Sequence, residues 1–153
     1  MAFQCRVGER INALPEKVFA AASDFAGAPG RIPGIKRIEM LTDGPVGLGT
    51  KFRETRVMFG KEATETMEVV DFQPGRSYTL RAYNCGCEYK TTVSVKSAGG
   101  TESEIEFDFS GQPRTIFAKV MTLAMGWLMN GTCVKMIKKD LTSLKMAVEK
   151  GAG

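Results

Sequence analysis

Charged side chains share one face of a predicted β-strand with large apolar residues, and this pattern points most directly to chemistry. Glu54 and Arg56 lie on the same face of the segment 50–59, and Glu65 falls on the matching face of the segment 62–72. Buried charges persist where they pair with one another or serve a ligand or a solvated cavity. The three residues could therefore bind a ligand carboxylate, carbonyl or hydroxyl, or form an ion pair at a cavity rim.

The register of these two strands depends on the turn between them. Gly60-Lys61 resembles a two-residue hairpin loop with glycine first, which pairs Phe59 with Glu62. In that register Arg56 lies directly opposite Glu65, whereas a register slip would expose the charges. One face of the hairpin then carries Phe52, Glu54, Arg56 and Met58 opposite Val69, Met67, Glu65 and Ala63. Because this face holds the larger apolar residues, we assign it to a ligand cavity.

Further strands and the C-terminal segment extend the predicted cavity. Its strand residues should be Tyr78, Leu80, Tyr89, Thr91, Phe107 and Phe109. Each tyrosine could donate a hydrogen bond to a ligand or act as an acid, although a core tyrosine with a satisfied hydroxyl is commoner. The helical wall should be formed by Phe117, Met121, Ala124, Met125 and Leu128. Methionine adapts to irregular guests, which suits a pliable wall; core packing with an added dimer contact is the alternative.

Composition excludes several kinds of chemistry. The chain of 153 residues contains no histidine, which removes histidine bases, Ser-His-Asp and Cys-His nucleophiles and the commonest metal ligand. Cys85 and Cys87 are separated by one residue rather than the two typical of zinc or redox motifs. We therefore expect no metal and no cofactor, with free thiols in the cytoplasm. The glutamates and Asp108 that alternate along 102–109 suit a solvated strand face better than acid–base or calcium chemistry.

Charge and hydropathy also limit the partners. The net charge of +4 is modest and the basic residues are scattered, so a nucleic-acid surface is not expected. No apolar run reaches the length of about 20 residues that a transmembrane helix needs, and no secretory signal is apparent. The apolar start of the C-terminal helix could still touch a membrane surface transiently, and the protein could be a monomer or a homodimer.

The elements that position these residues follow from periodicity. Strands are expected near 3–11, 35–42, 50–59, 62–72, 77–84, 87–96 and 102–109. Asn12 can cap a helix over 16–24 with Pro15 in its first turn, and any helix within 27–34 must be short. From Pro113 onward the apolar spacing is helical. A straight helix to Lys150 would be roughly 57 Å long, too long for a domain whose gyration radius is about 15 Å, so we expect a kink near Gly126 or Gly131.

Order and motifs together resemble the START-like (Bet v 1-like, SRPBCC) superfamily, in its polyketide cyclase/dehydrase and lipid-transport branch. The resemblance rests on PEKVF (15–19), DF (24–25), IPGI (32–35), GPVGLGTKF (44–52), VVDFQPGR (69–76) and DLTSL (140–144). It implies one α+β domain over 1–153 with the helix-grip fold. In that fold a seven-stranded curved antiparallel sheet wraps around a long C-terminal helix in β-α-α-β6-α order.

The resemblance also implies a cavity between sheet and helix for a hydrophobic or amphipathic small molecule such as a lipid or polyketide. It does not imply a single activity, and no catalytic motif of the aromatase/cyclase members is matched here. Three hypotheses therefore remain open. The leading one is a binding or transport protein; the others are a cyclase/dehydratase-type enzyme using Arg, Glu and Tyr in the cavity, and a co-chaperone-like protein-interaction module.

Overall fold

The computed structural model describes residues 3–58, 60–84 and 86–150, except for the side chains at 3, 58, 84, 121–130, 132 and 133. The chain begins with strand β1 (Phe3–Ile11), helix α1 (Pro15–Ser23) and a short 3-10 helix, η1 (Ala28–Gly30). Six strands follow: β2 (Ile35–Met40), β3 (Lys51–Met58), β4 (Lys61–Gln73), β5 (Ser77–Asn84), β6 (Cys87–Gly99) and β7 (Glu102–Pro113). Helix α2 (Ile116–Glu149) completes the chain. This is the element order expected from the sequence.

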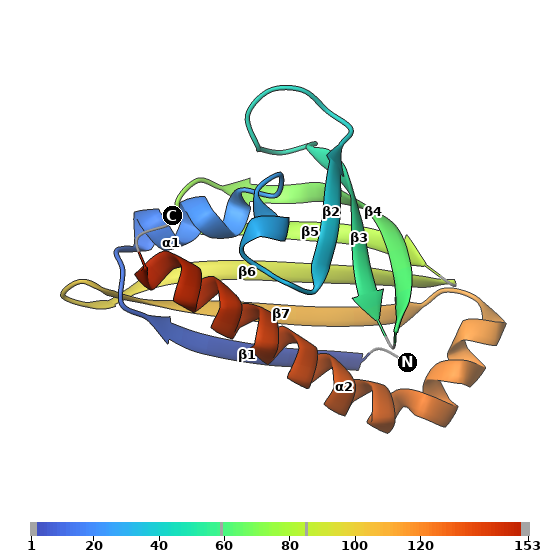
Figure 1. Ribbon diagram of the computed structural model, residues 1–153. Helices are drawn as coiled ribbons and strands as arrows, with labels where there is room; N and C mark the ends of the chain where they lie inside the picture. Colours follow the sequence, from blue (N-terminus) through green and yellow to red (C-terminus); the bar gives the residue numbers. More distant parts are fainter. Residues whose placement is uncertain (1–2, 59, 85, 151–153) are drawn as a thin grey trace.

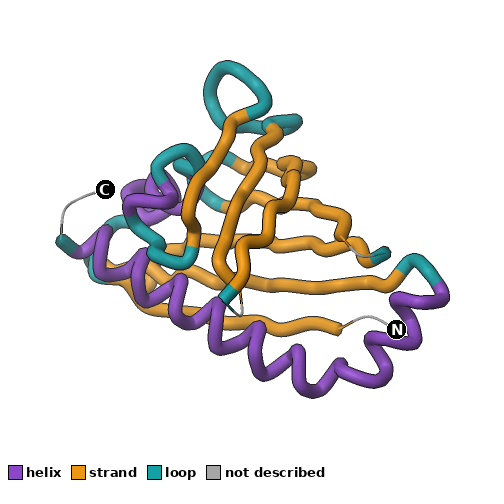
Figure 2. Tube along the Cα trace, turned by 45° about the vertical axis from the view of Figure 1, so that its right-hand side comes forward, coloured by secondary structure: helices purple, strands orange, loops and turns teal. Residues whose placement is uncertain are grey.

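The strands form one sheet in the order β1-β7-β6-β5-β4-β3-β2, with every neighbouring pair antiparallel. The sheet curves, and α2 crosses its concave side while α1 and η1 close one end (Figure 1; Figure 2). This arrangement is the helix-grip fold predicted above. It leaves the inner faces of β3 to β7 turned toward the helices.

Apolar side chains on the second half of α2 join the helix to the sheet. Ile137, Leu141, Leu144 and Val148 recur at helical spacing and are buried in the same core as Val18 of α1. The start of α2 is capped by Thr115, whose side-chain oxygen accepts a hydrogen bond from Ala118 N at 3.1 Å. The helix is one continuous element that bends in its orange portion, so its first turns project past the sheet (Figure 1).

Two local predictions are wrong. The β3–β4 hairpin pairs Met58 with Lys61, so Lys61 belongs to β4 and not to the loop. Gly60 lies in the turn with a φ of 77°, a conformation that favours glycine. In addition, the residue before α1 is Leu14, and Asn12 does not cap the helix. The backbone N–H of Asn12 instead donates to Oε2 of Glu149 at 2.7 Å.

A glycine next to the start of α2 provides a test of this packing. Gly86 has a φ of 76°, and an added Cβ would lie 2.5 Å from Oγ1 of the capping Thr115. Gly75 has a φ of 77° with open space around it, so Gly75→Ala is a matched control. We expect Gly75→Ala to lower the free energy of unfolding by about 1–2 kcal/mol through backbone strain alone. Gly86→Ala should cost about 1 kcal/mol more, because Thr115 must leave its capping position. Equal costs in urea denaturation would contradict the close packing.

Candidate functional site

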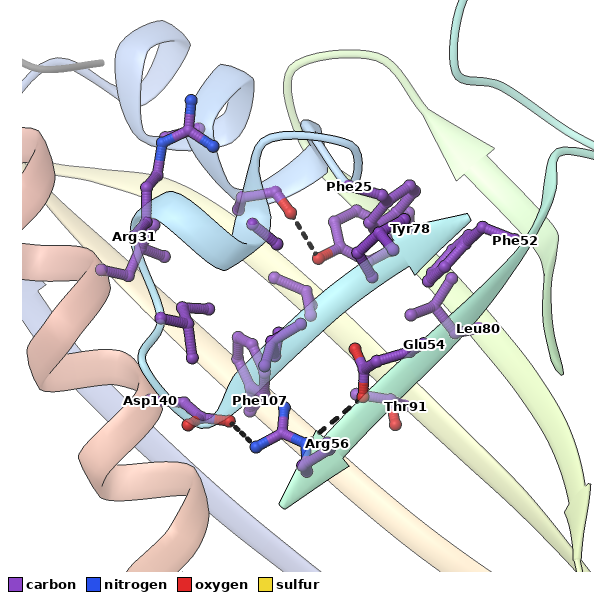
Figure 3. Close-up of a pocket in the computed structure, with 18 residues that line it drawn as sticks. Phe25, Arg31, Phe52, Glu54, Arg56, Tyr78, Leu80, Thr91, Phe107 and Asp140 are labelled. Atoms are coloured by element: carbon purple, nitrogen blue, oxygen red, sulfur yellow. Dashed lines mark hydrogen bonds and ion pairs between the residues drawn. The ribbon is translucent and has the colours of Figure 1, made fainter. Parts of the chain in front are cut away.

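A pocket of about 90 Å³ lies between the inner face of the sheet, α1, η1 and α2 (Figure 3). Its walls are mostly apolar, and charged groups enter from β3 and α2. The lining residues are Ala21, Ala22, Phe25, Ala28, Arg31, Ile32, Ile35, Ile38, Phe52, Glu54, Arg56, Tyr78, Leu80, Thr91, Val93, Phe107, Asp140 and Leu144. A mostly apolar pocket with a few convergent polar groups is the usual form of a small-molecule site.

The charged groups form a triad centred on a guanidinium. Arg56 donates from Nε to Oε1 of Glu54 at 3.3 Å and from Nη1 to Oδ2 of Asp140 at 2.9 Å (Figure 3). The three side chains are 15%, 14% and 13% exposed for Arg56, Glu54 and Asp140 respectively. The arginine of β3 is therefore held between a carboxylate of its own strand and one from the long helix.

Burial dominates the ionisation of both carboxyl groups. It raises the pKa of Glu54, and the attraction of Arg56 only partly offsets that rise. The pKa of Asp140 is raised for the same reason, again against the attraction of Arg56. Burial alone would lower the pKa of Arg56, but the two carboxylates outweigh it and the pKa is raised. The guanidinium therefore stays charged, while each carboxyl group holds its proton to a higher pH than usual.

Local sequence explains how the triad closes. Asp140 follows Ile137 by three residues and precedes Leu144 by four, so it shares their inward helical face. Gly34 comes just before β2, and a Cβ there would lie 3.3 Å from Nη1 of Arg56. The absence of a side chain at Gly34 thus leaves room for the guanidinium to reach the helix.

Aromatic side chains form the other end of the pocket. The rings of Phe25 and Phe52 stack at 4.4 Å, and Tyr78 meets Phe25 edge-on at 5.2 Å. The Tyr78 hydroxyl donates to the backbone oxygen of Ala22 at 2.8 Å. Burial, with a smaller effect of Glu54, raises the pKa of Tyr78. Tyr78 thus remains neutral and uses its proton to hold α1 against β5, which is the commoner of the two roles considered for it.

The hairpin register corrects the predicted partner of Arg56. Arg56 lies opposite Ala63, not Glu65, while Glu54 lies opposite Glu65 and Phe52 opposite Met67. The shift is two residues, so each side chain keeps its predicted face. Arg56 accordingly finds its second carboxylate on α2 instead of β4.

The structure brings together a subset of the predicted ligand-contacting residues. Those that line the pocket are Phe52, Glu54, Arg56, Tyr78, Leu80, Thr91 and Phe107. Val69 is fully buried and Met67 half-buried in the adjoining core, outside the pocket lining. Tyr89 and Phe109 stack on each other at 5.8 Å, also away from it, and Glu65 is half-buried.

Of the residues predicted to form the helical wall of the cavity, the structure describes the side chain of Phe117. Phe117 is 73% exposed and does not line the pocket, which corrects its assignment to the cavity. Its neighbours Ile116 and Val120 are exposed as well, because this first part of α2 projects past the sheet (Figure 2). The side chains of Met58, Met121, Ala124, Met125 and Leu128 lie outside the described residues.

Arg31 is a second cation at the pocket wall. Its Nη2 donates to Oδ2 of Asp24 at 2.8 Å. A Cβ at Gly27 would lie 2.9 Å from Nη1, which is buried without a hydrogen-bond partner among the described residues. Figure 3 shows the Arg31 side chain directed toward α1, away from Arg56. The charge of Arg31 is therefore matched by Asp24 within the α1–η1 turn.

Metal-binding groups, cysteine thiols and membrane-spanning helices can be assessed over the described part of the chain. No group of three or more metal-ligating side chains occurs among those residues. Cys5 and Cys87 are buried thiols, whereas Cys85 and the side chain of Cys133 lie outside the description. Within the described ranges, no helix has the length and apolar character needed to cross a membrane.

Fold and pocket together define a START-like, Bet v 1-like domain. Residues 4–149 match the family described as polyketide cyclase / dehydrase and lipid transport, and the chain belongs to that family. Comparison with curated proteins gave no significant match.

Solved structures support the fold at low sequence identity. A protein from Thermus thermophilus is 17% identical with a TM-score of 0.80, covering 99% of this chain and 100% of its own. A START superfamily protein from Mycobacterium smegmatis is 14% identical with a TM-score of 0.80, covering 96% and 97%. The Zhui aromatase/cyclase from a Streptomyces species is 14% identical with a TM-score of 0.79, covering 100% and 97%.

Proposed function

We propose that this protein binds a hydrophobic or amphipathic small molecule in the pocket between the sheet and α2. The observation that carries the proposal is the combination of apolar walls with the buried Glu54–Arg56–Asp140 triad at one end. The family description, which includes lipid transport, supports the same function. An apolar wall supplies affinity, and a few fixed polar groups orient the ligand.

The size of the pocket restricts the ligand. At about 90 Å³ it holds more than a single water but is smaller than the roughly 300–1,000 Å³ of pockets that enclose drug-sized molecules. We therefore expect a small ligand, or one end of a larger ligand whose remainder requires α1, η1 or α2 to move.

A pocket-filling variant tests the location of binding. Thr91 lines the pocket, whereas its neighbour Lys90 is exposed on the opposite face of β6. Thr91→Phe should weaken binding of an uncharged hydrophobic fluorescent probe such as phenylnaphthylamine by at least about tenfold, because the new ring occupies the apolar space. Lys90→Phe should leave binding unchanged. Circular dichroism confirms that both variants are folded, and equal probe binding by the wild type and Thr91→Phe would contradict the proposed location.

The second candidate is a cyclase/dehydratase-type enzyme acting in the same pocket. It is favoured by the raised pKa values of Glu54 and Asp140, since a carboxyl group that stays protonated to higher pH can act as a general acid. Conversion of a linear poly-β-ketone thioester to an aromatic product by the wild type, and its loss in Thr91→Phe, would support this function over binding alone.

A further inference from the structure

The charges that enter the pocket are unequal in number. Arg56 supplies one positive charge, and it is flanked by two carboxyl groups, Glu54 and Asp140. When both are ionised, the triad carries a net charge of about −1. The other cation of the wall, Arg31, faces Asp24 in the α1–η1 turn and does not offset this excess. The polar end of the pocket is therefore acidic in balance.

We infer that the polar end of the ligand is a protonated amine on a small apolar or aromatic body, held by Glu54 and Asp140. This inference rests on the function proposed above and names its ligand class. It differs from the ligand groups expected from the sequence, which were a carboxylate, a carbonyl or a hydroxyl. Because Arg56 already lies between two carboxylates, an incoming anion would meet like charges at a largely buried site.

Two further features agree with a cationic ligand. A carboxylate accepts hydrogen bonds only, so a protonated amine matches the oxygens of Glu54 and Asp140 that Arg56 leaves free. The rings of Phe52 and Phe107 line the same pocket, and aromatic faces attract cations.

Three probes of one shape test the inference: phenethylamine, phenethyl alcohol and phenylacetate, which are cationic, neutral and anionic at neutral pH. Each is titrated into the wild type and followed by NMR shifts of pocket residues. We expect phenethylamine to bind about tenfold more tightly than phenethyl alcohol and phenylacetate to bind weakest. Glu54→Gln should remove most of the preference for phenethylamine over phenethyl alcohol. Glu68→Gln is the control, since Glu68 pairs with Arg81 away from the pocket.

The possible results distinguish a failure of the amine inference from a failure of the proposed ligand-binding function. Equal binding of all three probes, or tightest binding of phenylacetate, would overturn the amine inference while supporting a ligand pocket. A preference for the amine that persists in Glu54→Gln would also overturn the role given to that carboxylate. If none of the probes binds and the fluorescent probe is insensitive to Thr91→Phe, both the inference and the proposed function are contradicted.

Discussion

Arg56→Met is expected to lower the free energy of unfolding by about 3–5 kcal/mol near neutral pH, the usual cost of removing one partner from a buried ion pair. Glu54 and Asp140 would remain buried beside each other without their shared cation. Arg53→Met is a matched control on the same strand, because Arg53 is 45% exposed and pairs with Glu39 on the outer face. That change should cost no more than about 1 kcal/mol. Equal losses in urea denaturation would show that the triad contributes little to stability.

The pH dependence of this variant has a definite sign. Glu54 and Asp140 have pKa values raised above their ordinary values of 4.5 and 3.8, so the folded state binds more protons than the unfolded state in that range. Their contribution to stability is present at low pH and is lost as the pH rises through the raised values. Removal of Arg56 raises both further. The stability deficit of Arg56→Met should therefore shrink as the pH falls from neutrality toward the ordinary pKa values of 4.5 and 3.8, and a deficit that is constant with pH would contradict the charge argument.

Phe52→Ala is expected to lower the free energy of unfolding by about 3–5 kcal/mol. Phe52 is only 1% exposed, stacks on Phe25 and belongs to both the core and the pocket wall. Its loss removes apolar contact and leaves a cavity that the curved sheet fills only in part. Phe117→Ala is the control with the same substitution at an exposed ring, and it should change stability by less than about 0.5 kcal/mol. Comparable losses for both variants would place Phe52 outside the core.

Much of the fold could be predicted because strand parity survives errors of register. The hairpin between β3 and β4 was misplaced by two residues, yet Glu54 and Arg56 kept their inward face. Alternation of side chains has a period of two, so only an odd shift exchanges the faces. The turn itself was harder, because a positive φ at Gly60 fits more than one loop position.

The site was less predictable because its partners come from distant segments. Asp140 lies 84 residues from Arg56, and strand pairing alone favoured Glu65 as the carboxylate. A usable signal was present, since Asp140 shares the inward helical face of Ile137 and Leu144. The contribution of Phe25 and the 28–35 segment depends on how α1 and η1 fold over the sheet, which periodicity does not determine.

Asp140, the carboxylate that the sequence did not identify as a partner of Arg56, changes the net charge of the site. With Glu65 as its partner, Arg56 could have bound a ligand carboxylate, carbonyl or hydroxyl. With Glu54 and Asp140 on either side, the same arginine becomes the centre of an acidic triad. The polar group that we propose for the ligand therefore changes from a carboxylate, carbonyl or hydroxyl to a protonated amine.

A crystal structure of the protein with phenethylamine tests most directly whether the pocket between the sheet and α2 binds an amine. We expect electron density for the ring among Phe25, Phe52 and Phe107, with the amine nitrogen about 2.7–3.2 Å from an oxygen of Glu54 or Asp140. Density for the ligand only outside this pocket, in crystals whose pocket is open to solvent, would contradict it.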